Sequence, residues 1–205
     1  MSIPPPLDPR RYAAEAVILF GSRAAGVERA ESDWDILVVG RGVDAHGQGL
    51  DVVVVEPEQF GCASWRDSEL AGHVARWGQT LEGSPRWLER LTADHRPSVE
   101  AVAFKRRTLA AQMCALQHYW PSLGPWARDR RTLKLRRDLQ RHARLVEGIA
   151  VPPTALLDRA WASATSAEAR RLLAKAGFAQ AGEIADWLAT RSGSSSSERE
   201  QEIEA

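Results

Sequence analysis

The sequence predicts an α+β fold, in which a small mixed-sheet domain is followed by a C-terminal helical bundle. Three short apolar runs rich in β-branched residues predict strands at Val17–Phe20, Asp35–Val39 and Leu50–Val55. From Val99 onward, only segments with helical spacing occur. Strands that are followed by helices, without regular alternation between the two, are typical of α+β proteins.

Short helices and loops are predicted around the strands. Prolines near the N-terminus leave room for only a short helix at Arg10–Glu15. The glycines within Gly40–Gly49 predict a mobile hairpin loop between the second and third strands. Apolar residues at helical spacing predict one helix over Trp65–Leu81, which ends at the turn Gly83–Pro85. Arg86–Leu91 forms one further short turn of helix.

The C-terminal part is predicted to hold a bundle of helices, several of which end at a proline or glycine. They span Val99–Tyr119, Arg128–Ile149, Thr154–Ala162, Ala167–Ala176 and Ala179–Thr190. The chain therefore divides into a sheet domain at residues 1–95 and a helical bundle domain at residues 96–191. Serines followed by a glutamate-rich end predict a disordered acidic tail at residues 192–205.

Composition and charge are those of a globular protein. Of the 205 residues, 44% are hydrophobic, and the formal net charge of zero provides no overall field towards nucleic acid or membrane. No apolar stretch approaches about 18 residues and no signal peptide opens the chain, which predicts a cytoplasmic protein without membrane contact. Cys62 and Cys114 lie far apart without metal-site spacing and are expected to be buried, reduced thiols.

Three aspartates near the strand ends carry most of the functional information. Asp33 and Asp35 stand two residues apart at the start of the second strand, so they point to one face while Trp34 points into a core. Asp51 opens the third strand. Such carboxylates repel one another unless a cation binds, and Mg²⁺ or Mn²⁺ prefers carboxylate and phosphate oxygens. Asp33 and Asp35 would bridge two ions, and Asp51 would bind the ion nearer the attacking hydroxyl and help take its proton.

The turn after the first strand is predicted to hold the phosphates of a nucleotide. Gly21 lets the backbone approach a phosphate, Ser22 offers a hydroxyl and an N–H, and Arg23 adds a cation. A Gly-Ser pair alone is weak evidence, and the residues before Asp35 could simply form a turn. The full order of strand, Gly-Ser, ten-residue spacer, Asp-x-Asp, strand and third aspartate is much more specific.

The runs Gly21–Gly26 and Ser32–Val38 together resemble the signature of the DNA polymerase β-like nucleotidyltransferase superfamily. The similarity is closest to the minimal nucleotidyltransferases and the aminoglycoside nucleotidyltransferase-like group, and it covers roughly residues 10–90. It implies that the Gly-Ser turn binds a nucleoside triphosphate and that the three aspartates bind metal and catalyse. Members transfer a nucleoside monophosphate, often from ATP, to a hydroxyl and release pyrophosphate. The bulky Trp34 and the short N-terminal segment depart from the pattern without touching the carboxylates.

Residues 128–144 form a strongly basic segment in a chain of zero net charge. The segment carries eight Arg or Lys residues against Asp129 and Asp138, and its leucines give it an apolar stripe. It could be a solvated amphipathic helix that pairs with local acids. It could also be a surface for an RNA acceptor, for the triphosphate or for an acidic protein. No aromatic stacking platform is expected to accompany the segment, so the sequence does not support specific single-strand recognition.

Arg137 and His142 have the Arg-x4-His spacing of the ribonuclease motif of HEPN domains, which are helical bundles and frequent neighbours of minimal nucleotidyltransferases. Arg136 fits the motif as well, and Asp138 stands where a polar residue is common. An arginine-rich helix meets this spacing easily by chance. The preferred interpretation is a bundle that binds substrate or dimerises, as in the aminoglycoside nucleotidyltransferases that the chain resembles; in the dimerising case the protein would be a homo-oligomer.

The preferred function is a metal-dependent transfer of a nucleoside monophosphate, with ATP as the expected donor, to a hydroxyl of a protein or RNA. The basic segment favours such an acceptor, and the resemblance to minimal nucleotidyltransferases implies a toxin–antitoxin or defence pair with a cognate partner. A small acceptor such as an aminoglycoside would need an acidic groove, for which Glu168, Glu183 and Asp186 are available. The remaining alternatives are a contact-acting antitoxin or assembly subunit with a vestigial site, and a ribonuclease that uses Arg137 and His142.

Overall fold

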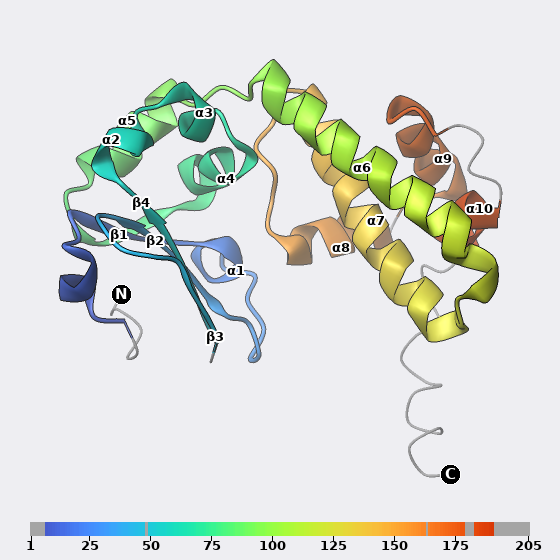
Figure 1. The fold of residues 1–205 in the computed structure, drawn as a ribbon, viewed down its shortest axis with the longest axis horizontal. Coiled ribbons are helices and arrows are strands. Elements are labelled where there is room, and N and C mark those ends of the chain that lie inside the picture. The colour runs from blue at the N-terminus through green and yellow to red at the C-terminus, as the bar shows by residue number, and fades with distance from the viewer. Residues whose placement is uncertain (1–6, 48, 163, 179–182, 191–205) are drawn as a thin grey trace, which may run out of the picture. The chain divides into compact units, whose positions relative to one another are not determined.

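The computed structural model describes residues 7–47, 49–162, 164–178 and 183–190 (Figure 1). It divides into two compact units, which we describe separately. One unit contains residues 1–103 and 144–156, and the other contains residues 104–143 and 157–205. A mixed sheet with short helices is followed by a helical C-terminal region, which confirms the predicted α+β class. The predicted acidic tail at residues 192–205 lies outside the described residues.

Five strands form one mixed sheet in the order β3-β4-β2-β1-β5. Strand β1 pairs antiparallel with β2 and β5, β2 runs parallel to β4, and β3 pairs antiparallel with β4. The three predicted strands are confirmed to within one residue. The strands span Ala16–Phe20 (β1), Trp34–Val39 (β2), Ala45–Gly47 (β3), Leu50–Val55 (β4) and Gln79–Gly83 (β5).

Strand β3 corrects the prediction for Gly40–Gly49. This segment is not a hairpin loop that joins β2 to β4, because those two strands are parallel. The chain instead turns back after β2 and forms β3 on the far side of β4 before it enters β4. The Asp44 carboxylate accepts a hydrogen bond of 2.8 Å from the backbone N–H of Val54, which fastens the returning segment to β4.

The helix predicted over Trp65–Leu81 is in fact two helices and a strand. Helices α3 (Ala63–Arg66) and α4 (Glu69–Trp77) are separated at Ser68, whose hydroxyl accepts a hydrogen bond from the backbone N–H of Ala71 and caps α4. The chain then extends into β5. The other short helices of this unit are η1 (Pro9–Tyr12), α1 (Gly21–Ala24), α2 (Pro57–Phe60) and α5 (Arg86–Asp94).

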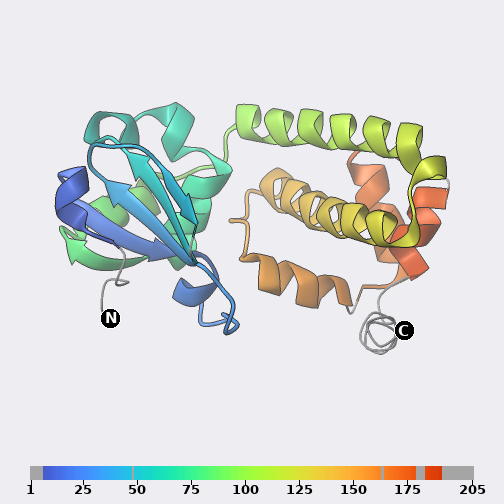
Figure 2. The ribbon, with the colours of Figure 1, turned by 60° about the horizontal axis from the view of Figure 1, so that its bottom comes forward.

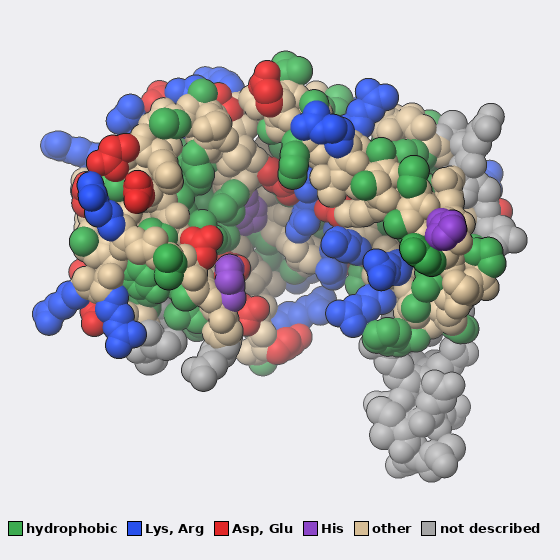
Figure 3. Space-filling model, viewed as in Figure 1, with side chains coloured by type: hydrophobic (Ala, Val, Ile, Leu, Met, Phe, Trp, Pro, Cys, Tyr) green, Lys and Arg blue, Asp and Glu red, His purple; other side chains and the backbone are tan. Residues whose placement is uncertain are grey.

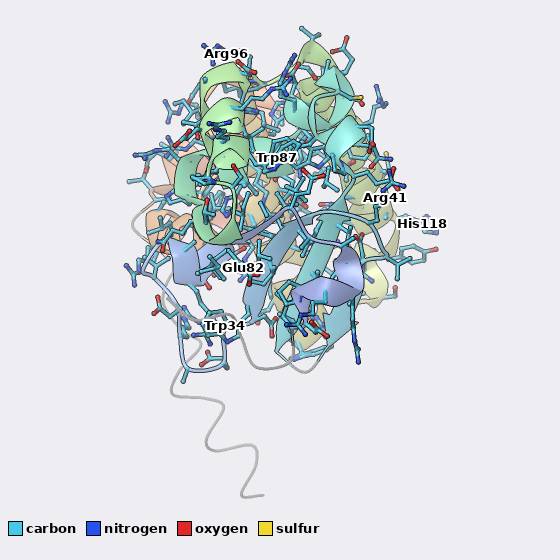
Figure 4. All side chains as sticks on the ribbon, turned by 90° about the vertical axis from the view of Figure 1, so that its left-hand side faces the viewer. Trp34, Arg41, Glu82, Trp87, Arg96 and His118 are labelled. Carbon is cyan, nitrogen blue, oxygen red and sulfur yellow. The ribbon has the colours of Figure 1, made fainter. Side chains whose placement is uncertain are left out.

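Both faces of the sheet are covered at its central strands β1, β2 and β4, whereas the edge strand β3 is exposed. One face packs against α2, α4 and α5 and includes Ile18, Leu37 and Val55. The opposite face includes Val17, Ile36 and the other strand residues that alternate with those of the first face. Figure 4 labels Trp87 of α5, which packs against the first face, and Trp34, which packs against the second. The strands therefore lack the alternation between apolar and polar residues that marks a sheet with one exposed face.

The helical region contains α6 (Val99–Tyr119), η2 (Trp120–Ser122), α7 (Pro125–Val146), α8 (Thr154–Ala162), α9 (Ser166–Lys175) and α10 (Glu183–Thr190), as Figures 1 and 2 show. Helices α6 and α8 have the predicted bounds, and α7 begins three residues earlier than predicted. Residues 179–182 of the last predicted helix lie outside the described residues. Leu109, Met113, Leu135 and Leu139 from α6 and α7 form a core with residues of α8, α9 and α10.

Two expectations from composition have different outcomes. Cys62 and Cys114 are free and exposed, so the prediction that both thiols are buried was wrong. Cys62 lies at the start of α3, and Cys114 lies on α6 outside the buried set of that helix. Within the described residues, no helix has both the length and the apolar character needed to cross a membrane.

Candidate functional site

Three polar side chains lie in a row across neighbouring strands at one end of the sheet. Asp35 on β2 is in register with Asp51 on β4, and His46 on β3 lies opposite Asp51 on the other side. Register partners have side chains on the same face, with strands roughly 5 Å apart. On β1, Phe20 is the partner of Asp35, which brings the turn at Gly21 beside the aspartate. We call Asp35, Asp51 and His46 the polar row.

Gly21 packs directly against the polar row. Its φ of +73° lies in the left-handed region, and a Cβ at this position would overlap the carboxylate of Asp35. The backbone N–H of the next residue, Ser22, donates a hydrogen bond to the same carboxylate. Glycine is therefore required here by the close approach of Asp35, whereas the sequence suggested a close approach of phosphate.

Asp35 lies where its charge is disfavoured. Its pKa is raised from the usual 3.8 to about 6, chiefly by burial and then by the neighbouring charges of Asp51 and Asp33. The N–H of Ser22 and the charge of Arg23 oppose this shift only in part. The site thus gathers negative charge without a full complement of protein cations to balance it.

Asp33 lies just before β2, and Arg23 fixes its backbone. The Arg23 Nη2 donates to the carbonyl oxygen of Ser32 at 2.6 Å, and Nε donates to the carbonyl oxygen of Asp33 at 3.2 Å. The guanidinium carbon lies 4.7 Å from the ring centroid of Trp34, which is half-buried. In this structure Arg23 therefore orders the entry into β2, and the carboxylate of Asp33 belongs to an exposed residue beside the polar row.

His46 belongs to the polar row, although its sequence context did not predict this position. Its Nδ1 contacts the Oδ1 of Asp51, and its side chain is 68% exposed. In the sequence His46 was one histidine in a glycine-rich segment, where a solvated side chain is the ordinary expectation. The strand register places it in the row: Gly47 pairs with Leu50, so the preceding residue pairs with Asp51.

The polar row fits a divalent cation that a substrate helps to hold. No group of three or more His, Cys, Asp or Glu side chains in the described part of the chain is placed to hold a metal by itself. Mg²⁺ does not require one, because it is usually bound by one or two carboxylates together with substrate phosphates. Asp35 and Asp51 supply two adjacent carboxylates, and a cation would offset the burial and the like charges that raise the pKa of Asp35.

The residues of the suggested ribonuclease motif are not brought together. The Arg137 guanidinium donates two hydrogen bonds of 2.8 Å to the carboxylate of Asp158 on α8. His142 is 4% exposed, and burial together with neighbouring cations lowers its pKa. Five positions on a helix turn the two side chains to different sides. Arg136 donates instead to the carbonyl oxygen of Leu188, at 3.1 Å.

The acidic residues that could have formed a groove for a small basic acceptor have local partners. The Glu168 carboxylate accepts a hydrogen bond of 2.7 Å from the backbone N–H of Thr165 and completes the cap of α9. Asp186 forms an ion pair with Arg170 at 3.0 Å. The side chain of Glu183 lies outside the described part of the structure.

Comparison with known proteins does not assign a function, so the assignment depends on the geometry of the site. No protein-family model and no curated protein matches the chain. Among solved structures, a crystal structure of a toxin–antitoxin with AMP-PNP is similar at 17% sequence identity, over 53% of this chain and 87% of that chain, with a TM-score of 0.27. A likeness at this level identifies neither the fold nor the activity of this chain.

Proposed function

We propose that this protein is a metal-dependent nucleotidyltransferase, which transfers a nucleoside monophosphate from a nucleoside triphosphate such as ATP to a hydroxyl of a protein or RNA. One observation carries the proposal. Asp35 and Asp51 lie side by side in register, and the Gly21–Ser22 turn packs against them. A structural role does not account for two adjacent carboxylates of which one has a raised pKa, whereas a cation bound with phosphates does.

Each residue at the site has a part in this chemistry. Asp35 and Asp51, with Asp33 beside them, would hold Mg²⁺ or Mn²⁺, which when bound neutralises the triphosphate and stabilises charge at the α-phosphorus. The backbone of the Gly21–Ser22 turn, which packs against Asp35, would offer N–H donors to phosphate oxygens. Positioning and charge neutralisation, rather than covalent chemistry, would supply most of the rate.

The transfer exchanges one bond at phosphorus for another. The acceptor oxygen forms a bond to the α-phosphorus, and the bond from this phosphorus to the bridging oxygen of the β-phosphate breaks, so that pyrophosphate leaves. The proton of the acceptor hydroxyl goes to Asp51. Contact with His46 holds the Asp51 carboxylate in place and gives the proton a second acceptor.

The position of the label in the nucleotide tests the proposed bond cleavage. Purified protein is incubated with Mg²⁺ or Mn²⁺, an extract of its own host and ATP labelled either at the α- or at the γ-phosphate. We expect a labelled band from the α-labelled nucleotide alone, since the γ-phosphate leaves with pyrophosphate. Digestion with protease or RNase then identifies the acceptor class, and a protein band would reveal a cognate toxin or defence partner.

Two matched variants control this experiment. Asp35→Asn removes one charge from the polar row with little change in shape and should abolish labelling. Asp94→Asn removes one charge from an exposed site on α5 and should label like the wild type. Label from the γ-phosphate, equal labelling by the two variants, or no label with any nucleoside triphosphate would overturn the proposal.

A further inference from the structure

Helix α7 presents a continuous line of basic side chains on one side. Arg130, Lys134, Arg137 and Arg141 follow one another at intervals of three or four positions, which places them on the same side of the helix. Trp126 continues this line by one turn towards the start of the helix. We call these five residues the α7 face. Figure 3 shows Lys and Arg side chains gathered over the part of the molecule where α7 lies.

Trp126 supplies the aromatic group that was not found within the basic segment. Helix α7 begins at Pro125, so Trp126 belongs to the helix and stands one turn before Arg130. The guanidinium of Arg130 lies 5.4 Å from its ring centroid. Trp126 is 66% exposed, whereas Trp120 and Trp161 of the same unit are 5% exposed and belong to the core. An exposed indole beside a cation is a platform on which an unpaired base can stack.

The charge of the α7 face is only partly balanced. Arg137 and Arg141 contact Asp158 and Asp138, yet their side chains remain 31% and 30% exposed. Arg130 and Lys134 form no ion pair with any of the described residues. Like charges three or four positions apart destabilise a helix, so a ligand that neutralised them would stabilise this one.

We infer that the α7 face binds single-stranded RNA. Successive phosphates of a strand would lie along the cations, and an unpaired base would stack on Trp126. A duplex would satisfy the cations but keeps its bases stacked inside, and an acidic protein segment has no base to place on the indole. The inference concerns the helical unit alone, so it holds whether or not the polar row transfers nucleotides.

Fluorescence anisotropy on the full chain tests this site directly. The probe is a labelled, unstructured RNA of about 15 nucleotides, titrated in EDTA without nucleoside triphosphate over a series of salt concentrations. We expect binding that weakens steadily as salt rises, because phosphate contacts release counterions. Arg130→Glu/Lys134→Glu should weaken binding at least about tenfold, and Trp126→Ala should weaken it about tenfold, while Trp126→Phe retains most of the affinity.

Arg107→Glu/Arg171→Glu is the matched control. It changes the net charge by the same amount, and it alters two exposed arginines on α6 and α9. It should keep the affinity within about threefold of the wild type, since screening confines charge effects to short range. Circular dichroism melting curves verify that each variant is folded.

Four results would overturn the inference. They are no RNA binding at low salt, equal losses in the two charge-reversal variants, undiminished binding by Trp126→Ala, and preferential binding of a duplex or of a glutamate-rich peptide over the single strand. Because no nucleoside triphosphate is present, none of these results bears on nucleotide transfer. A failure of the labelling experiment likewise leaves this one intact.

Discussion

At the scale of single residues, Asp35 is the group whose charge is most at odds with its surroundings. Its pKa in the metal-free fold is raised to about 6, from the ordinary value of 3.8. The folded protein therefore binds this proton more tightly than the unfolded chain does. The benefit is complete below pH 3.8 and is lost as the pH rises to about 6, so ionised Asp35 destabilises the metal-free fold at neutral pH.

Asp35→Asn should stabilise the metal-free protein at neutral pH although it abolishes transfer. We expect the free energy of unfolding at pH 7.5 to rise by about 1–2 kcal/mol, after allowance for the partial exposure of the side chain. The gain should disappear near pH 4, where Asp35 is itself protonated. Urea denaturation in EDTA across this pH range measures it, with Asp94→Asn as the control. A gain that does not depend on pH would contradict the explanation.

Gly21→Ala should be costly for two separable reasons. The left-handed backbone costs roughly 1 kcal/mol for alanine, and the added Cβ overlaps the Asp35 carboxylate. We therefore expect a total loss of about 3 kcal/mol in the wild type and a smaller loss in an Asp35→Ala background, where most of the overlap is gone. A double-mutant cycle from urea denaturation gives the difference. Equal losses in the two backgrounds would show that backbone strain alone is responsible.

The aspartates could be predicted from the sequence, whereas His46 could not. Alternation along a strand fixes the face of Asp35 from local sequence alone, and Asp51 follows because it opens the next long apolar run. The position of His46 depends on β3, a strand of three exposed residues without apolar alternation. Its pairing with β4 joins His46 to a residue only five positions away, but the short exposed strand has no apolar pattern from which to predict it.

At the scale of elements, Asp138 joins α7 to α6. It is 4% exposed and accepts a hydrogen bond of 2.8 Å from the Gln112 side-chain amide. The Nζ of Lys105 lies 3.6 Å from its carboxylate, and Lys105 is itself only 13% exposed. A buried carboxylate with these partners stabilises the packing of the two helices and is not placed for a catalytic role.

Asp138→Ala should destabilise the helical unit strongly, by about 3 kcal/mol, because the buried Lys105 loses its carboxylate. Adding Lys105→Met should recover part of the loss, since the second change removes the buried charge that has lost this carboxylate. Thermal and urea denaturation of the single and double variants test both statements. Asp158→Ala, which breaks a more exposed pair with Arg137, serves as the comparison and should cost about 1 kcal/mol. A loss for Asp138→Ala no larger than this would contradict the assignment.

The helices of the C-terminal region were predictable and the short strand β5 was not. Helices α6 and α8 have the predicted bounds because a proline lies near one end of each, whereas α7 both begins and ends three residues earlier than predicted. Strand β5, with the sequence Gln-Thr-Leu-Glu-Gly, contains one apolar side chain. It forms because the edge of β1 offers unpaired backbone N–H and C=O groups. The sheet, and not the local sequence, therefore determines this strand.

At the scale of the whole molecule, the cores of the two units are separate. One core surrounds the five-stranded sheet, and the other joins residues of α6 to α10. The change along the chain from short apolar runs rich in β-branched residues to helical spacing predicts a sheet region followed by a helical region. The assignment of residues 144–156 to the sheet unit was not predictable, since it depends on long-range contacts such as that of the His73 ring with the carbonyl oxygen of Val151.

Ligand binding at the polar row should therefore protect the two units unequally. With Mg²⁺ and a non-hydrolysable ATP analogue, we expect slower amide hydrogen exchange in β1, β2 and β4, which contribute the site. Exchange in α9 should stay unchanged because its core is separate. Mass spectrometry of exchanged peptides measures both, and Asp35→Ala should erase the effect in the strands. Protection that is equal in α9 and the sheet would contradict this prediction.

The alignment of β4 with β2 has a consequence for how the sheet selects its pairing. Four consecutive valines, at positions 52–55, follow Asp51, and both faces of the sheet are apolar. A slip by one residue would exchange valines for valines, so the apolar side chains alone barely distinguish one pairing from the next. The same slip would drive Asp51 into the position of Val52, which is fully buried. Asp51, which is proposed to take part in the reaction, thus also favours the correct pairing of β4 with β2.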